Sequence, residues 1–166
     1  MATKENLKEA FAGESQANRK YLAFAKKAEA EGRPQIARLF RAAAEAETVH
    51  AHNHLRVLGE IKGTKENLEA AIEGEGFEFK HMYPNFIAEA EKEGDKQAIT
   101  TFQYANDVEK IHHRLYSEAL EKLNAGQDLP KADIYICGVC GYTVAGEPPD
   151  KCPVCGSVRK VFRMIE

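Results

Sequence analysis

An internal repeat constrains this sequence more than any other feature. The residues from Thr3 to Glu14, TKENLKEAFAGE, return from Thr64 to Glu75 as TKENLEAAIEGE, 61 positions later. A chain that repeats a long segment of itself is expected to fold as two copies of one structural unit.

The repeat continues beyond these first segments. Residues 28–40 resemble residues 88–102 once two residues are inserted, and ETVH at 47–50 returns as EKIH at 109–112. The two copies therefore each contain the equivalent of two helices, and the repeat predicts a pair of helical hairpins.

Helical periodicity runs through the chain to about residue 123, which is rich in Ala, Glu, Lys and Leu. It is interrupted at 31–34, 61–64 and 93–96, where Gly, Pro or Thr occur. These breaks are too short for anything but tight reversals, so consecutive helices should be antiparallel neighbours. The expected fold of residues 1–125 is an all-α, four-helix bundle.

The composition changes after residue 124. We expect a linker at 126–133, followed at 134–166 by a small β-rich domain with Gly, Pro and β-branched residues in place of helix formers. About thirty residues cannot bury an adequate apolar core, so this domain needs a covalent or metal staple. The candidates are two CxxC pairs: Cys137, Cys140, Cys152 and Cys155.

Charge and hydropathy exclude several classes of partner. The 26 acidic and 23 basic residues are mixed along the chain, so no basic face for nucleic acid or anionic lipid is predicted. No apolar run approaches the length of a membrane span, and the first residues lack the apolar core of a signal peptide. The expected location is the cytoplasm, where clustered cysteines indicate a metal rather than disulfides.

Acidic side chains interrupt the apolar stripe of every predicted helix. Following apolar positions at spacings of three and four residues places glutamates near the middle of each stripe. The interrupting residues are Glu14, Glu47, Glu75, Glu78 and Glu109, together with His50 and His112. A carboxylate buried without a partner is costly, and no Lys or Arg lies on these stripes. The pattern predicts a cationic centre.

Two of these helices carry Glu-x-x-His, as Glu47 with His50 and Glu109 with His112. A glutamate from each of two helices and a Glu-x-x-His from each of the others is the pattern by which bundles hold two carboxylate-bridged metals. A single Glu-x-x-His arises by chance on a Glu-rich helix, but two at duplicated positions favour a metal site. Imidazole with carboxylate suits iron or manganese.

Glu78 has no counterpart in the first half, where position 17 is alanine. Symmetry would supply six ligands, and Glu78 adds a seventh. A spare carboxylate on one side predicts that one metal changes ligands between oxidation states, because Fe(III) prefers hard oxygen ligands more than Fe(II) does.

With these motifs the chain resembles the rubrerythrins, which fuse a ferritin-like di-iron bundle to a C-terminal rubredoxin-like domain. The resemblance covers essentially the whole chain. It rests on FAGES at 11–15, ETVH, EGEGFEF followed by MYP at 73–84, EKIH, CGVCGY at 137–142 and CPVCG at 152–156.

The resemblance implies a role for each candidate residue. One iron would be served by Glu14, Glu47 and either Glu78 or His50, and the other by Glu75, Glu109 and His112. Glu47 and Glu109 would bridge the irons, and His50 and Glu78 would exchange. Tyr21 and Tyr83 would hydrogen-bond near the irons and so join the catalytic residues; the alternative is that they are ordinary core tyrosines.

The four cysteines alone do not identify the metal of the C-terminal domain, because two CxxC knuckles are also the ligand pattern of a zinc ribbon. A rubredoxin-type iron is favoured by CGY after the first knuckle, by CPVCG, by the flanking aromatics Tyr135 and Phe162, and by a redox partner in the same chain. Gly141 and Gly156 would let the backbone turn N–H groups toward sulfur.

The expected function is reduction of hydrogen peroxide to water in oxidative-stress defence. The resemblance implies electrons relayed through the thiolate-bound iron from an external rubredoxin or an NAD(P)H-dependent reductase, since the chain has no dinucleotide-binding GxGxxG. It also implies a homodimer. The alternatives are a ferroxidase or iron-storage protein of the ferritin-like class, and a structural protein with zinc at every site.

Overall fold

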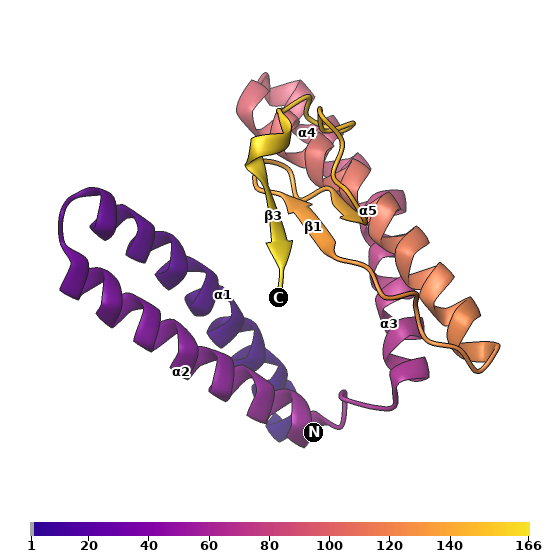
Figure 1. Ribbon diagram of the computed structural model, residues 1–166. Coiled ribbons are helices and arrows are strands. Elements are labelled where there is room, and N and C mark those ends of the chain that lie inside the picture. The colour runs from indigo at the N-terminus through magenta and orange to yellow at the C-terminus, as the bar shows by residue number, and fades with distance from the viewer. Residues whose placement is uncertain (1) are drawn as a thin grey trace. The chain divides into compact units, whose positions relative to one another are not determined.

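The computed structural model describes residues 2–166, whose contacts divide the chain into two compact units (Figure 1). One unit ends at Lys62 and the other runs from Gly63 to Glu166. Each unit contains a helical hairpin, and the second also carries a C-terminal sheet.

The first unit is a hairpin of two long helices, α1 (Ala2–Ala30) and α2 (Pro34–Leu58). The reversal uses Gly32, whose φ of 72° is left-handed, and Pro34, whose fixed φ suits a first helical turn. Small buried side chains line the helices: Ala25, Ala28, Ala37, Ala44 and Ala51. Alanines let two helix axes approach closely, which explains the straight, tightly paired hairpin.

One buried polar side chain also joins α1 to α2. Asn18 is 6% exposed and donates from Nδ2 to the Ala44 carbonyl at 2.7 Å and to Thr48 Oγ1 at 2.8 Å. Because a buried amide needs hydrogen-bond partners, these contacts fix the register of α1 against α2 beside Glu47.

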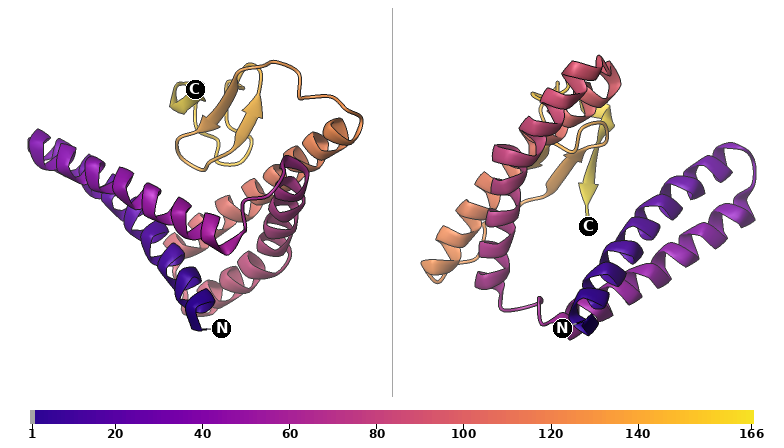
Figure 2. Two further views of the ribbon diagram at one scale, coloured as in Figure 1. Left: turned by 90° about the horizontal axis from the view of Figure 1, so that it is seen from below. Right: turned by 180° about the vertical axis from the view of Figure 1, so that it is seen from behind.

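The second unit begins with a helical rod that lies along α5 (Lys96–Asn124) (Figure 2). The rod consists of α3 (Thr64–Phe77), a π-helix η1 (Glu78–Met82) and α4 (Tyr83–Glu93), which follow one another directly. A left-handed Gly94 ends α4, and Asp95 caps α5 by accepting from the backbone N–H groups of Gln97 and Ala98 at 3.0 Å.

The π-helix is the place where the two copies of the repeat differ in length. Glu14 and Glu75 are 61 positions apart, whereas Tyr21 and Tyr83 are 62 apart, so the second copy gains one residue between them. A residue added to an α-helix would rotate everything after it by about 100°. A π turn absorbs the extra residue, so Tyr83 keeps the place that Tyr21 has in the first hairpin.

The offset of 62 continues through the following turn. Gly32 and Gly94 both adopt left-handed φ angles, of 72° and 73°, and end the first helix of their hairpins. The two-residue insertion expected between 28–40 and 88–102 is therefore wrong. One residue is inserted, and it lies earlier, in η1.

The C-terminal part of the second unit is a three-stranded antiparallel sheet in the order β2-β1-β3. The strands are β1 (Ile134–Cys137), β2 (Thr143–Ala145) and β3 (Phe162–Ile165), and a short 3-10 helix η2 (Arg159–Val161) precedes β3. Cys137 ends the central strand, so the sheet fixes the start of the first CxxC knuckle.

A mostly helical chain with a small C-terminal strand region confirms the expected fold class. The helix breaks near 31, 61 and 93 are confirmed, and the π-helix is the addition that periodicity did not predict. The division at 1–125, 126–133 and 134–166 stays a prediction. Across residues 2–166, no helix combines the length and apolar character that a membrane crossing requires.

Candidate metal centres

The first hairpin brings Glu14, Glu47 and His50 together as a half-site. Glu14 comes from α1, and the other two from α2, where a spacing of three places them on one face. His50 Nδ1 lies 2.9 Å from Glu47 Oε2 and 3.9 Å from Glu14 Oε1. Ligand atoms of all three lie within 4.8 Å of one another.

The second unit builds the same arrangement from Glu75 on α3 and from Glu109 and His112 on α5. His112 Nδ1 lies 2.8 Å from Glu109 Oε2 and 3.6 Å from Glu75 Oε1, again with all ligand atoms within 4.8 Å. This half-site is better shielded: the His112 side chain is 27% exposed, against 53% for His50.

The electrostatics of the second half-site favour a cation. Burial, then the negative charge of Glu109 and a hydrogen bond between the two carboxyl groups, raise the pKa of Glu75 to about 7. The hydrogen bond to Glu109 raises the pKa of His112, against the effect of burial. Carboxylates held together in this way need protons or a metal ion to balance them, so the donor set fits a metal.

Glu78 lies near the second half-site but outside its group of three ligands. It is the first residue of η1, one turn after Glu75. Burial and the negative charge of Glu109 raise its pKa, while His112 acts in the opposite direction. The structure therefore places six of the seven predicted bundle ligands in two groups of three and leaves Glu78 beside the second.

The two predicted tyrosines occupy equivalent aromatic clusters. Tyr21 contacts Phe24 and Phe40 with ring centroids 6.3 Å apart in each case, and Tyr83 contacts Phe86 and Phe102 at the same distances. Each tyrosine thus belongs to a cluster of three aromatic rings that is partly exposed, with Phe24 and Phe86 on the exposed side.

The carboxylates at and beside the second half-site also act electrostatically on Tyr83. Burial, followed by the charges of Glu78, Glu109 and Glu75, raises its pKa. Its hydroxyl is therefore held in the protonated form, which can donate a hydrogen bond.

Tyr116 is a site residue to which the sequence assigned no role. Its ring centroid lies 6.5 Å from that of His112, and burial and then the charges of Glu75 and Glu109 raise its pKa. The available signal was its position on α5, four residues after His112 and hence on the same face.

The four cysteines converge on one point. Cys137 Sγ lies 3.7 Å from Cys155 Sγ, and Cys140 Sγ lies 3.5 Å from Cys152 Sγ. A disulfide would need about 2 Å, whereas ligands about 2.3 Å from a tetrahedral metal lie about 3.8 Å apart. The spacing fits four thiolates around one metal ion.

Two glycines shape the loops that hold these sulfurs. Gly141 and Gly156 have left-handed φ angles of 87° and 73°, and their N–H groups donate to the carbonyls of Cys137 and Cys152 at 2.9 Å. Each glycine closes the turn of its own knuckle.

The backbone N–H of the residue after each glycine hydrogen-bonds a cysteine sulfur. This agrees with the prediction that Gly141 and Gly156 let the backbone turn N–H groups toward sulfur. The Tyr142 N–H bonds Cys140, and Ser157 bonds Cys155 through both its backbone and its hydroxyl. Burial opposes ionisation of Cys155, but the Ser157 hydrogen bonds lower the pKa of this thiol to about 6. A thiolate at this position is a ready metal ligand.

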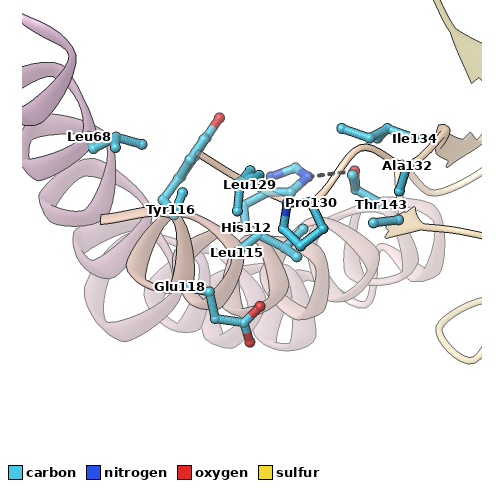
Figure 3. A pocket seen from close by; sticks show the side chains of 12 residues that line it. Leu68, His112, Leu115, Tyr116, Glu118, Leu129, Pro130, Ala132, Ile134 and Thr143 are labelled. Atoms are coloured by element: carbon cyan, nitrogen blue, oxygen red, sulfur yellow. Dashed lines mark hydrogen bonds between the residues drawn. The ribbon is translucent and has the colours of Figure 1, made fainter. Parts of the chain in front are cut away.

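The strand β2 lies against α5 beside the second half-site. His112 Nε2 is 3.0 Å from Thr143 Oγ1, drawn as a dashed line in Figure 3. Next to this contact is a cavity of about 520 Å³ with mostly apolar walls, formed by α3, α5, β1, β2 and the connection at Leu129 and Pro130. His112 and Tyr116 both lie on its α5 wall (Figure 3).

Comparison with known proteins matches both parts of the chain. Residues 5–120 match the family model described as rubrerythrin, and residues 135–163 match the rubredoxin-like domain of rubrerythrin. Rubrerythrin-2 of Clostridium acetobutylicum is 37% identical over 97% of this chain and 95% of its own length. Nigerythrin of Nitratidesulfovibrio vulgaris is also 37% identical, over 97% of this chain and 85% of its own.

Solved structures of nigerythrin agree with this result. They include a mixed-valence state and a fully reduced, all-ferrous state, each with a TM-score of 0.59 and 35% identity over 98% of this chain and 86% of theirs. The carboxylate and histidine groups and the four clustered cysteines are those of a di-iron site and a rubredoxin-type iron site. The chain belongs to the rubrerythrin family.

Proposed function

We propose that this protein reduces hydrogen peroxide to water at a two-iron centre that draws on both half-sites, and that electrons reach this centre through the four-cysteine iron. The observation that carries the proposal is the duplicated half-site, Glu with Glu-x-x-His, on a chain that also gathers four thiols. The all-ferrous description of the related nigerythrin supports iron as the metal.

The chemistry requires two electrons and two protons for each peroxide. Two iron ions, when bound, supply both electrons to the O–O bond, and the product is two molecules of water. A single thiolate-held iron exchanges one electron at a time, so two transfers restore the centre.

Protonated groups at the second half-site support proton delivery. Tyr83 and Tyr116 hold their hydroxyl protons at neutral pH, as phenols ordinarily do, and burial and neighbouring carboxylates raise the pKa of each phenol further. We assign Tyr83 the role of a hydrogen-bond donor near the irons. Tyr21 has the equivalent place in the first hairpin.

Glu78 is proposed as the seventh ligand, in exchange with His50. The pKa of the Glu78 carboxyl is raised by burial and by Glu109, so a nearby cation would favour its charged form. His50 is the more exposed of the two half-site imidazoles and has more room to move. Glu47 and Glu109 would bridge the irons.

The surfaces of the hairpins support assembly into a four-helix bundle, from one chain or from two. Ile36 and Val57 on the first hairpin are 50% and 71% exposed. Removing such apolar side chains from water is favourable. If two hairpins paired through their glutamate-bearing faces, these side chains would be buried together with the metal ligands.

The electron donor is proposed to be an external rubredoxin or an NAD(P)H-dependent reductase, and the working assembly a homodimer. The sequence has no dinucleotide-binding GxGxxG of its own. The proposed role is defence against oxidative stress, in the cytoplasm. The four cysteines form no disulfide, as is usual in a reducing compartment, and so stay available to a metal.

Stopped-flow mixing of the fully reduced protein with peroxide, and separately with oxygen, tests the proposal. Oxidation of the centre should be much faster with peroxide. Faster oxidation by oxygen would contradict the peroxidase function. A hollow multi-subunit particle that accumulates ferric mineral would favour the iron-storage alternative.

A further inference from the structure

We propose that Thr143 is a positioning residue for His112: its hydroxyl accepts the Nε2 proton of the imidazole and so reserves Nδ1 for metal. The inference rests on His112 being a metal ligand, as the proposed function requires, and not on the identity of the substrate. Thr143 lies in the C-terminal sheet, 31 residues from His112 in the sequence.

The single proton of the Thr143 hydroxyl determines the direction of its hydrogen bond with His112. Thr143 Oγ1 donates to the Gly141 carbonyl at 3.0 Å, and a carbonyl can only accept. The hydroxyl has a single proton, so its second contact, with His112 Nε2 at 3.0 Å, must be one in which the imidazole N–H donates. The contact therefore requires a proton on Nε2.

The other ring nitrogen faces the carboxylates. His112 Nδ1 lies 2.8 Å from Glu109 and 3.6 Å from Glu75, the atoms with which it shares the half-site. A metal bound there takes the place of the Nδ1 proton and leaves the Nε2 proton on Thr143. A hydrogen bond from the far side of a ligating imidazole fixes the ring and raises its basicity toward the metal.

The backbone of the same loop also lies close to α5. A side-chain carbon at Gly141 would lie 3.8 Å from Val108 Cγ1, and Val108 is a buried residue that directly precedes Glu109. Gly141 directly follows Cys140, one of the four predicted thiolate ligands. Its carbonyl accepts from the Thr143 hydroxyl, which in turn contacts His112, so hydrogen bonds connect the cysteine loop to the imidazole. The C-terminal sheet thus sets a ligand of the helical site.

The test uses the full-length protein loaded with Zn(II), which is diamagnetic and redox-inert. Nitrogen-15 NMR identifies the Nε2 proton of His112, and its exchange with solvent is compared in the wild type, Thr143→Val and Thr143→Ser. Valine keeps the β-branched shape of a strand residue but removes the hydroxyl. Thr100→Val is the matched control, because the exposed Thr100 hydroxyl donates to the Lys96 carbonyl of its own helix, at 2.9 Å.

In Thr143→Val the Nε2 proton should exchange at least about tenfold faster than in the wild type, and zinc should bind about tenfold more weakly than to the wild type. Thr143→Ser and Thr100→Val should behave like the wild type in both measurements. Equal exchange and equal affinity in Thr143→Val and the wild type would overturn the inference. So would equal losses in Thr143→Val and Thr143→Ser, or an Nε2 that coordinates the zinc. Because none of these readouts involves peroxide, they stand apart from the test of the peroxidase function.

Discussion

His112 Nδ1 lies 2.8 Å from Glu109 Oε2, and the first hairpin repeats this contact between His50 and Glu47 at 2.9 Å. The spacing of three residues along a helix creates the pair locally, and a glutamate from the neighbouring helix completes it. Each hairpin therefore carries a prearranged group of three candidate metal ligands.

Replacing Glu109 with glutamine removes the charge that faces both His112 and Glu75 but keeps the side-chain size. We expect the affinity of the bundle for iron to fall at least about 100-fold, since the loss of an outer partner alone costs 10–100-fold. Iron analysis, with the thiolate site counted separately by its visible absorption, measures the loss. The control is Glu121→Gln on the exposed face of the same helix. Full iron content in Glu109→Gln would show that this carboxylate is not a ligand.

Glu78→Ala should retain iron, because the six other ligands remain, but should slow oxidation by peroxide about 100-fold. The carboxylate proposed to exchange with His50 is lost, and even an outer partner of a metal site is worth about 10–100-fold. Stopped-flow absorbance of the reduced variant gives the rate. Glu73→Ala, an exposed glutamate on α3, is the matched control. Wild-type kinetics in Glu78→Ala would refute ligand exchange by this residue.

Protein whose half-sites hold no metal, but whose four-cysteine site is filled, should lose stability as the pH rises; filling that site removes the opposite effect of Cys155, whose pKa is lowered to about 6. The carboxyl of Glu75 titrates near 4.5 when unfolded and near 7 when folded, so between these values the folded state holds the extra proton. His112, whose pKa is also raised, contributes stability below its unfolded value of 6.5 that is lost as the pH rises through its folded value. Both effects have the same sign, and the titration of Glu75 alone costs about 2 kcal/mol after allowance for solvent screening.

Thermal unfolding of this protein, with metal at the four cysteines alone, at pH 5 and pH 8 checks this expectation. Glu75→Gln, which cannot ionise, should lose most of the dependence. A melting temperature that increases from pH 5 to pH 8 would contradict the account of the second half-site.

Cys155→Ser should abolish the ferric-thiolate absorption and sustained turnover, because four thiolates no longer surround the metal. The reduced bundle should still be oxidised once by peroxide, since its own ligands are untouched. Single-turnover and steady-state measurements separate the two. Undiminished steady-state turnover with a physiological donor would exclude the proposed relay.

Ala44→Leu tests the packing of the first hairpin. Ala44 is fully buried, and added methylene groups in such a position cost about 1–3 kcal/mol. Amide hydrogen exchange in α1 and α2 reports the loss of protection. Ala42→Leu, at an exposed position of α2, should have little effect. Similar protection in the two variants would mean that the alanine contacts do not hold the helices together.

Much of the fold and the half-sites could be predicted because their signals are local. The turns at Gly32 and Gly94 follow from residue types that break helices, and the Glu-x-x-His pairs follow from helical spacing. The clustering of the cysteines likewise follows from the two CxxC knuckles.

The features that escaped prediction depend on tertiary context. One added residue in η1 leaves no compositional mark, and only its position in the helix identifies it as a π turn. The contact between His112 and Thr143 joins residues 31 positions apart in different kinds of secondary structure, so no periodicity predicts it. Tyr116 lies four residues after His112 on the same face of α5, but it belongs to no sequence motif.

Mössbauer spectroscopy of protein reconstituted with iron-57 tests the central claim most directly. The account predicts three irons per chain: one held by four thiolates and two by oxygen and nitrogen ligands of the groups around His50 and His112. One equivalent of peroxide added to the fully reduced protein should convert both of the latter to coupled ferric ions. Iron confined to the thiolate site, or an oxygen- and nitrogen-bound pair that stays ferrous after peroxide, would contradict it.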